Sequence, residues 1–447
     1  MEFISSIFNY ISGLGSYVMI PIMITIVGLV VRLKPIKALK AGITVGIGLI
    51  GLDIVLGLIW TNIGPVAELF VEKFNLNLTT IDTGWGAAAG LAFSTTIGSF
   101  IIPFIILVNI LLLTFKLTRT VNIDIWNYWH YAFSGATVYM LTNNILYGFI
   151  AAAAHCTISL RIADMTAPIV QKSLGIPGIS IPQGFAVSTV PIYAVLDRVY
   201  DTILPWTKDK QDKKIDSSKL SFISVIAEPI FLGLIIGILL GLSVGYAIGN
   251  SLQLGMSMAA LMYLLPRVTK IIMEGLLPIS EQTRTFMQKK YQGAEFYIGL
   301  DSAVLLGLPA TVSVGLLLIP VSLFLAMIIP MNTTLPLGDL AATAFFISMA
   351  TPMHKDNFIR TLISGTIMMA VVLLVASFFA PMITIFAQGG GMEIPAGAVQ
   401  VTALSAGNLI ALIIYQLSRL GFIGIALVIA LVACILYITR QRKKETV

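Results

Sequence analysis

Ionisable and amide side chains stand at a few places inside long apolar runs of this chain. One such run ends at His354, Asp356 and Asn357. The matching place in the first half holds Asn143 and Asn144. Such groups are costly to bury, and are usually kept because they bind a solute, carry an ion or pass a proton. Simpler explanations stay open: Asn143 and Asn144 cap a broken helix, while Asp356 pairs with the lysine before it and His354 caps the break.

Other side chains add hydrogen-bonding or aromatic groups. Gln183 lies in a Pro- and Gly-containing turn, Asp82 and Asp301 precede long apolar runs, and Trp85 follows Asp82. Asp82 has an alternative as a helix N-cap, and Trp85 as an anchor at the membrane interface. The predicted binding residues are Gln183, His354, Asp356, Asn357, Asn143, Asn144, Asp82, Asp301 and Trp85.

The remaining reactive side chains have ordinary explanations. His130 and His155 are single histidines on apolar faces, and we interpret them as helix contacts. Arg161 and Asp164 stand three residues apart and are predicted to pair with each other. The 2 cysteines have neither metal-ligand spacing nor a disulfide pattern. We therefore expect no catalytic residue, no metal and no cofactor.

Helices in a membrane must position these side chains. Hydrophobic residues make up 57% of the chain and charged residues 11%, and the mean hydropathy is +0.95. A soluble domain carries about 25% charged residues, so lipid must cover the apolar surface here. The net charge of +6 comes from short basic loops and does not indicate nucleic-acid binding. The sequence predicts an all-α polytopic membrane protein.

The two halves of the chain share a pattern, 213 positions apart. In the first copy Ala167-Pro168 precedes Ile181-Pro182-Gln183-Gly184, and in the second Ala380-Pro381 precedes Ile394-Pro395-Ala396-Gly397. Duplicated halves that are broken by Pro and Gly at matching places are typical of transporters, with the site at the breaks.

Apolar runs and basic loops predict the topology. Spans are expected near residues 14–33, 41–63, 85–115, 144–165, 185–206, 221–249, 254–275, 303–330, 358–387, 396–418 and 420–439. The basic loops 32–40 and 207–219 and the tail 440–444 are placed in the cytoplasm, which leaves the N-terminus outside. Five spans then precede the linker, so the second half is an inverted repeat of the first, and one terminal helix follows it.

Some segments are too short or too irregular to cross the membrane alone. Re-entrant segments are predicted at 125–140 and 340–353, and non-helical breaks at 174–184 and 388–397. Non-helical backbone at membrane depth is tolerated only inside protein or beside a watery cavity, so these segments mark the cavity wall. The predicted parts are a first repeat (1–206), a cytoplasmic linker (207–220), a second repeat (221–418) and a terminal helix with its basic tail (419–447).

A family resemblance rests on four segments. They are 79–86 (TTIDTGWG), 124–129 (DIWNYW), 178–184 (GISIPQG) and 350–357 (ATPMHKDN). In these the chain resembles the membrane subunit (IIC) of galactitol-type bacterial phosphotransferase systems, in the ascorbate–galactitol superfamily. The similarity covers nearly the whole chain.

The resemblance implies uptake of galactitol or a related polyol across the bacterial inner membrane, coupled to its phosphorylation. A separate IIB protein would carry the phosphoryl group on a cysteine and a IIA protein would recharge it, so this chain would be the transport component of a phosphotransferase complex. The resemblance also implies a homodimer in which a core (82–206 and 295–418) moves as an elevator against a V-shaped scaffold (14–63 and 221–275).

A polyol offers only hydroxyl groups, so its site needs paired donors and acceptors in a dry pocket. Gln183→Ala and His354→Ala are each expected to abolish polyol binding. The basic run 267–290 is an orientation signal or a docking surface for IIB. The alternative function is an H⁺- or Na⁺-coupled secondary polyol or sugar transporter, in which Asp301 and Asp356 carry the ion.

Overall fold

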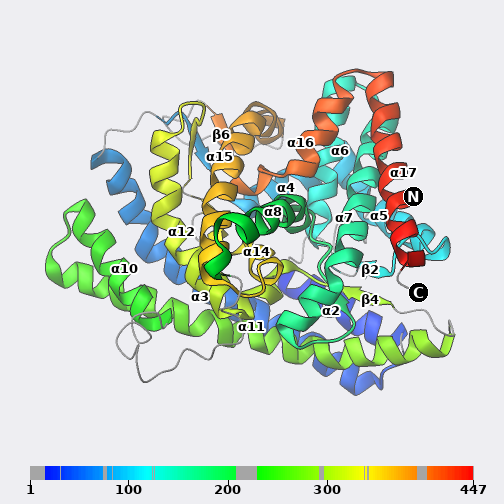
Figure 1. Cartoon of the computed structure of the whole chain (residues 1–447), viewed down its shortest axis with the longest axis horizontal. Helices are drawn as coiled ribbons and strands as arrows, with labels where there is room; N and C mark the ends of the chain where they lie inside the picture. The colour runs from blue at the N-terminus through cyan, green and yellow to red at the C-terminus, as the bar shows by residue number, and fades with distance from the viewer. Residues whose placement is uncertain are drawn as a thin grey trace.

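Figure 1 shows the computed structural model, which describes residues 16–30, 32–73, 78–82, 84–122, 124, 126–207, 229–290, 296–336, 338–339, 342–389 and 400–445. Most of these residues are helical. Among them, three helices are long and apolar enough to cross a bilayer: α7 (Ile145–Leu174), α12 (Pro309–Ile328) and α15 (Phe358–Gly389). Shorter apolar helices accompany them, as expected of a polytopic membrane protein.

Four helices form a group in which each packs on the next. α2 (Ser16–Val30) packs on α3 (Pro35–Lys73), α3 lies along α11 (Ile248–Lys290), and α11 packs on α10 (Pro229–Val244). In Figure 1, α11 runs along the lower edge of the view. The group therefore joins the first two described helices of one half of the chain to the first two described helices of the other.

The long helices of this group extend beyond the spans predicted from apolar runs. α3 has 39 residues and α11 has 43, whereas the predicted spans cover 41–63 and 254–275. An added Cβ at Gly237 of α10 would lie 2.6 Å from the Cα of Gly255 in α11. Small residues therefore allow α10 and α11 to approach closely.

Two small parallel sheets connect the halves of the chain. The strands are β1 (Thr80–Asp82), β2 (Thr120–Asn122), β3 (Ile179–Ser180), β4 (Tyr297–Gly299), β5 (Thr334–Leu335) and β6 (Gln400–Thr402). β1 lies between β5 and β6, and β4 lies between β2 and β3. Each central strand comes from one half of the chain, and both of its neighbours come from the other half.

The all-α prediction is wrong for these strands. Each strand has only two or three residues, which is too short to display the alternation that marks a strand in a sequence. The strands form because segments far apart in the chain satisfy one another's backbone groups.

The remaining described elements lie between the strands and the long helices. They are α4 (Trp85–Ser94), α5 (Thr96–Thr114), η1 (Trp126–Tyr128), α6 (Trp129–Thr142), α8 (Gly184–Ile203), η2 (Pro205–Thr207), η3 (Ser302–Gly307), α13 (Thr343–Phe346), α14 (Ala350–Met353), η5 (Leu404–Ala406), α16 (Leu409–Ser418) and α17 (Phe422–Glu445). Two predicted spans are interrupted: 85–115 breaks at Thr95, whose hydroxyl accepts from the Gly98 amide (3.0 Å), and 396–418 is an α-helix only from Leu409. The segment 125–140 forms η1 and one helix, α6, whereas 340–353 forms the short helices α13 and α14.

The strand register changes one predicted correspondence between residues of the two halves. Ser180 pairs with Gly299 of the central strand β4, and Thr402 pairs with Asp82 of the central strand β1. Counting onward from these pairs, Ser405 stands where Gln183 stands, rather than the predicted Ala396. The turn 394–397 itself lies outside the described residues, as does the linker from residue 208.

The sheets belong to the buried core. The largest buried apolar cluster surrounds α12 and α15 and includes Ile179 of β3 and Ile298 of β4. A second cluster lies among α4, α5, α6, α7 and α15 and includes Val401 of β6. Side chains at the strand ends are therefore held by packed apolar neighbours.

Candidate functional site

Asp124, Asn127 and Asp301 meet at the carboxyl edge of the β2–β4–β3 sheet. Parallel strands end on the same side, so the segments that follow β2, β3 and β4 converge there. The Asn127 amide nitrogen donates to Asp124 Oδ2 at 2.5 Å and also to Asp301 Oδ2. Asp301 Oδ1 accepts from the Ala303 amide at 2.5 Å and so caps η3. Asp124 is buried and Asp301 is half-buried.

Gln183 caps α8 and is bonded to His130. Its Oε1 accepts from the Ala186 amide at 2.5 Å, which fixes the orientation of the side-chain amide. Its Nε2 therefore donates to His130 Nε2 at 2.9 Å, and an accepting Nε2 belongs to a neutral imidazole protonated on Nδ1. The His130 ring also stacks on Trp129, with ring centroids 3.8 Å apart. Among the described hydrogen bonds, none uses the second N–H hydrogen of Gln183.

His155 lies on the other side of the start of α8. A carbonyl can only accept, so His155 Nε2 donates to Gly184 O (3.4 Å) and its Nδ1 accepts from the Ser134 hydroxyl (2.7 Å). A Cβ at Gly184 would lie 2.7 Å from His130 Cβ and 3.1 Å from His155 Nε2. Only glycine fits between the two rings, and His155 is the helix contact that the sequence predicts.

Tyr131 links the segment after β3, which carries Gln183, to the end of β2, which precedes Asp124. Its hydroxyl donates to Pro182 O at 2.9 Å and accepts from Asn122 Nδ2 at 3.4 Å. A Cβ at Gly299 would lie 2.7 Å from Pro182 Cγ, so the strands come together closely here. We call the following residues the carboxyl-edge site: Asp124, Asn127, His130, Gln183 and Asp301.

Asp82 lies at the end of β1 in the other sheet and is bonded to the segment that carries Asp339. It accepts from three backbone amides at 2.6–3.3 Å, those of Gly84, Asp339 and Leu404. Asp339 in turn accepts from the amides of Trp85 (2.7 Å) and Ser405 (3.0 Å). The two buried carboxylates tie three segments together, which is more than the predicted N-cap. Asp82 and Trp85 thus belong to one cluster, and the described hydrogen bonds do not join that cluster to Gln183 or Asp301.

His354 lies in an ion-paired cluster between α8 and α15. Its Nδ1 is 3.0 Å from Asp197 Oδ1 and its Nε2 is 2.7 Å from the Ser364 hydroxyl. Arg360 Nη1 donates to Asp197 at 2.9 Å and to Asp201 at 3.1 Å. Both ring nitrogens of His354 therefore have protein partners, and the ring is only 2% exposed.

Asn357 and Asp356 stand at the start of α15. Asn357 Oδ1 accepts from the Arg360 amide at 3.1 Å, and its Nδ2 donates to Thr207 O at 2.8 Å. Asp356 is exposed, with a left-handed backbone (φ 61°). Asn357 therefore caps the start of α15, a role that the sequence did not predict for it.

Asn143 and Asn144 also cap helices. Asn143 ends α6 in the left-handed conformation (φ 52°) and is exposed. Asn144 Oδ1 accepts from the amides of Leu146 (3.0 Å) and Tyr147 (3.4 Å) at the start of α7. Among the described hydrogen bonds, none joins this pair to the carboxyl-edge site.

Several residues of these clusters were not predicted: Asp124, Asn127, Asp339, Asp197 and Arg360. Asp124 and Asp339 are buried acids near the ends of strands that the sequence did not reveal. The cost of burying a carboxylate, which pointed to Asp301, could have pointed to Asp339 in its apolar run as well. Within the described residues, no group of three or more His, Cys, Asp and Glu side chains could hold a metal ion.

The sequence predicts that His354→Ala abolishes polyol binding. Because both ring nitrogens of His354 have protein partners, we expect instead that the change destabilises the protein and leaves polyol affinity unchanged. The change removes one hydrogen bond to a carboxylate and one to a buried hydroxyl, about 2–4 kcal/mol together. The measurements are the apparent Tm of the purified protein and the Kd for galactitol. A Kd that rises as steeply as for Asp301→Ala, at an unchanged Tm, would assign His354 to the polyol site instead.

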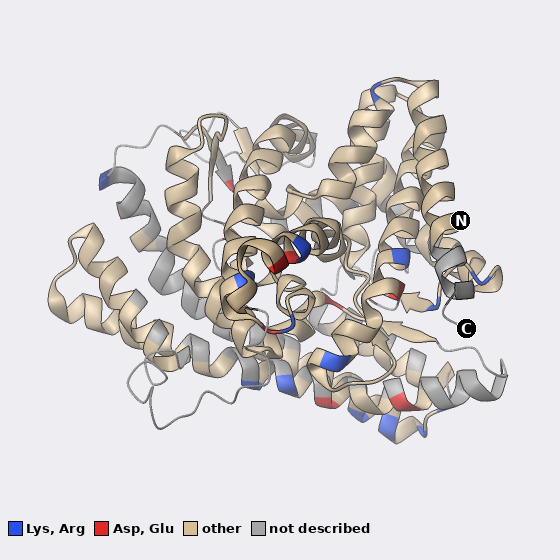
Figure 2. Cartoon of the chain, viewed as in Figure 1, with Lys and Arg blue, Asp and Glu red and all other residues tan. Residues whose placement is uncertain are grey.

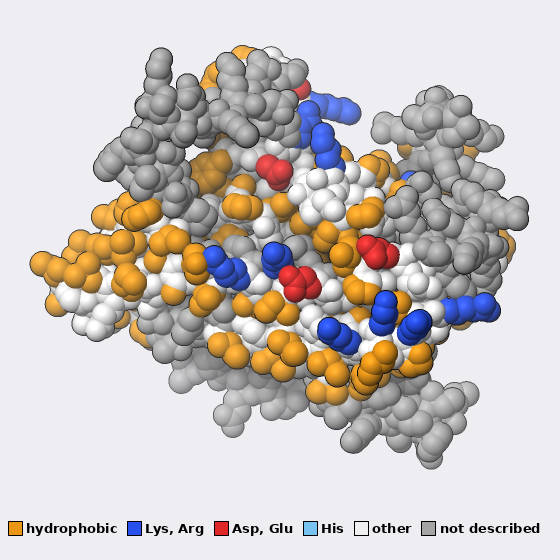
Figure 3. All heavy atoms as spheres, turned by 90° about the horizontal axis from the view of Figure 1, so that it is seen from below, with side chains coloured by type: hydrophobic (Ala, Val, Ile, Leu, Met, Phe, Trp, Pro, Cys, Tyr) orange, Lys and Arg blue, Asp and Glu red, His pale blue; other side chains and the backbone are white. Residues whose placement is uncertain are grey.

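Basic side chains are exposed on the long helices. Lys34, Lys37 and Lys40 are exposed at the start of α3, and Arg267 and Lys270 on α11. Figure 2 colours the charged residues on the ribbon and shows that many of those described lie along the lower helices, and Figure 3 shows Lys and Arg side chains on the face seen from below. The side chains after residue 282 in the predicted run 267–290 lie outside the described ones. This face is referred to below as the α3–α11 basic face.

Comparison with known proteins places these features in a family. Residues 10–397 match the family described as the PTS system sugar-specific permease component. A protein of Escherichia coli (strain K12), named as a candidate permease IIC component, is 42% identical over 437 residues, which cover 98% of this chain and 99% of that protein. The galactitol-specific EIIC components of the PTS systems of Escherichia coli strains K12 and O157:H7 are each 36% identical over 378 residues, 83% of this chain and 82% of theirs. The chain belongs to the family of sugar-specific permease components of the phosphotransferase system.

Proposed function

We propose that this protein is the membrane subunit through which a phosphotransferase system takes up galactitol or a related polyol. Two of the relatives above are named as galactitol-specific, and their identity extends over most of both chains. The observation that carries the proposal is the carboxyl-edge site, in which Asn127 bonds two carboxylates and Gln183 follows the neighbouring strand β3 at the same edge of the sheet. A separate IIB protein supplies the phosphoryl group, with a IIA protein to recharge it.

The carboxyl-edge site matches the chemistry of a neutral polyol. Hydroxyl groups donate to carboxylates, and the half-buried Asp301 offers them an acceptor. The second N–H of Gln183 offers a donor to a hydroxyl oxygen. An anionic sugar would meet repulsion from Asp124 and Asp301, so the site favours an uncharged substrate.

The contribution of this chain to phosphoryl transfer is positioning. It would present one hydroxyl of the bound polyol to the phosphoryl group on IIB, which converts an encounter in solution into a reaction within a complex. Cys156 is fully buried, which fits a phosphoryl carrier on another protein.

The architecture we propose has two inverted repeats that enclose the site. Support comes from the two sheets, in each of which a central strand of one half pairs with two strands of the other. The α2, α3, α10 and α11 group would be the scaffold, and the part with the sheets would be the core that moves in a homodimer. The N-terminus would lie outside and the basic C-terminal tail in the cytoplasm.

Transport by proteoliposomes tests the function. With IIA, IIB, the general phosphate carriers and phosphoenolpyruvate on the cytoplasmic side, labelled galactitol should arrive as its phosphate, and omission of IIB should stop phosphorylation. If the chain alone accumulates free galactitol when given a pH or Na⁺ gradient, the ion-coupled alternative is correct and the proposal is wrong.

Gln183→Ala should weaken galactitol binding by about 10-fold, because it removes one neutral hydrogen bond of about 1–1.5 kcal/mol. The measurement is equilibrium binding of labelled galactitol to the purified protein. Gln416→Ala, at an exposed glutamine on α16, is the matched control and should bind normally. An unchanged Kd for Gln183→Ala would remove Gln183 from the site.

A further inference from the structure

The amino edge of the β2–β4–β3 sheet carries a group of basic side chains. Arg119 directly precedes β2, and its guanidinium carbon lies 4.8 Å from the ring centroid of Tyr297, the first residue of β4. Arg161 Nη1 donates to Leu117 O at 2.8 Å. Lys116 is exposed beside this segment. The Arg119 and Arg161 side chains are therefore fixed by contacts with neighbouring segments of the protein.

Lys172 lies at the same edge of the sheet. The spans predicted from the sequence place residues 116–124 and 166–184 on opposite sides of the membrane, but β2 and β3 both pair in parallel with β4, so the structure brings the two segments to one side. Lys172 is exposed near the end of α7, next to Gln171, whose amide donates to Ile179 O in β3 at 2.9 Å. We call the following residues the cationic edge: Lys116, Arg119, Arg161 and Lys172.

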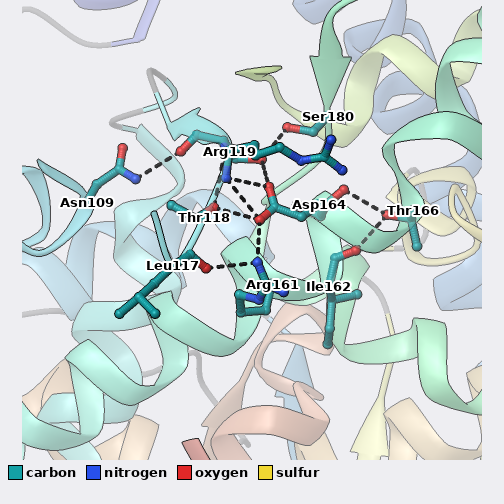
Figure 4. Close-up of polar contacts among 11 residues, drawn as sticks. Asn109, Leu117, Thr118, Arg119, Arg161, Ile162, Asp164, Thr166 and Ser180 are labelled. Carbon is teal, nitrogen blue, oxygen red and sulfur yellow. Dashed lines mark hydrogen bonds and ion pairs between the residues drawn. The ribbon is translucent and has the colours of Figure 1, made fainter. Parts of the chain in front are cut away.

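One buried carboxylate, that of Asp164, holds this edge together, and Figure 4 shows the contacts that converge on it. Asp164 accepts from the Thr118 hydroxyl at 3.0 Å, the Arg119 amide at 3.0 Å and the Thr120 hydroxyl at 2.8 Å. It also pairs with Arg161 at 3.0 Å, as the spacing predicts. Asp164 thus forms an ion pair with Arg161, and the exposed Lys116 and Lys172 add positive charge to the edge.

The amino edge of the other sheet is anchored in the same way, but by a neutral hydroxyl group. Ser377 of α15 accepts from the Thr333 amide at 3.1 Å and bonds the Thr334 hydroxyl at 2.8 Å, as Asp164 of α7 does with Arg119 and Thr120. Thr333, directly before β5, therefore stands where Arg119 stands before β2. A neutral hydroxyl is sufficient to hold an edge strand of this kind, so the strand pairing does not require the cationic edge.

The cationic edge lies close to the carboxyl-edge site. The strands between the two edges have two or three residues, and a strand rises about 3.3 Å per residue, so the edges are about 10 Å apart. A protein that contacts the cationic edge therefore comes within a short distance of the bound polyol. Arginine is well suited to bind a phosphate-bearing partner because its planar group donates in pairs.

We propose that the cationic edge is the docking surface for the phosphorylated IIB protein. This inference rests on the proposed function. The negative charge of a phosphorylated partner complements the edge, and a protein bound there lies about 10 Å from the carboxyl-edge site. Basic residues also orient membrane proteins, but the exposed lysines and arginines of the α3–α11 basic face already provide such a signal.

Charge reversal tests the docking surface. The double variant Lys116→Glu with Lys172→Glu changes two exposed side chains. A triple variant also carries Arg119→Glu, at a half-buried side chain. Galactitol phosphorylation is measured in proteoliposomes against the concentration of phosphorylated IIB. The double variant should need about 10-fold more IIB for half-maximal rate, because charges at the rim of an interface mainly set the rate of encounter. Its maximal rate, and its Kd for galactitol without IIB, should stay unchanged.

Matched controls separate the possible outcomes. Arg267→Glu with Lys270→Glu, on the α3–α11 basic face, should leave the IIB dependence unchanged. If only that control raises the IIB requirement, docking is at α11 and the inference is wrong. It is also wrong if the double variant loses activity only in vesicles rich in anionic lipid, with its IIB dependence intact. A wild-type chain that binds no galactitol, or phosphorylates none with IIB present, would instead contradict the proposed function.

Discussion

Asp301→Ala is expected to weaken galactitol binding by about 100-fold, or about 2.7 kcal/mol. The change removes a carboxylate acceptor, and a hydrogen bond to a charged group contributes about 1.5–3 kcal/mol. It also leaves one N–H of the buried Asn127 without its partner. Both effects fall on the carboxyl-edge site, so this is the largest change in affinity that we predict.

The measurement is equilibrium binding of labelled galactitol to the purified protein. Asp301 also caps η3, so the apparent Tm of each variant must be recorded. Asp301→Asn keeps the shape and one acceptor and should fall between wild type and Asp301→Ala. Glu274→Gln removes an exposed carboxylate on α11 and should bind normally. Near-normal affinity of a folded Asp301→Ala protein would show that the polyol binds elsewhere.

Asp164→Ala is expected to be the most destabilising single change, with a loss of about 3–5 kcal/mol in the free energy of unfolding. It leaves Arg161 without its carboxylate and three buried or half-buried donors without an acceptor. The strand β2 would lose its anchor on α7, and the carboxyl-edge site would move with it. Thermal or denaturant unfolding of the purified protein measures the change.

A double substitution provides the control for this prediction. Asp164→Ser with Arg161→Leu copies the neutral arrangement of the other sheet, where Ser377 and Leu374 have the same spacing on α15. We expect it to recover most of the stability that Asp164→Ala loses, because a hydroxyl can hold the strand and no buried charge is left unpaired. A double variant as unstable as Asp164→Ala would show that the sheet needs its charges, which would weaken the argument for a docking role.

Local features were predictable from the sequence. The apolar runs that became α7, α12 and α15 and the pairing of Arg161 with Asp164 depend on residues close together in the chain. Helix capping by Asn144 is equally local. The family resemblance is also a property of the sequence, and the comparisons confirm it.

The tertiary structure decided how distant residues meet. Asn127 bonds Asp301 across 174 positions, and His354 bonds Asp197 across 157, so one predicted residue lies in the carboxyl-edge site and the other in an ion-paired cluster. The strands that converge at that site have two or three residues, and such short strands form only when their partners from the other half are in place. Hydropathy and helix capping act within a few turns, whereas strand pairing and the contacts of buried carboxylates depend on which segments pack together.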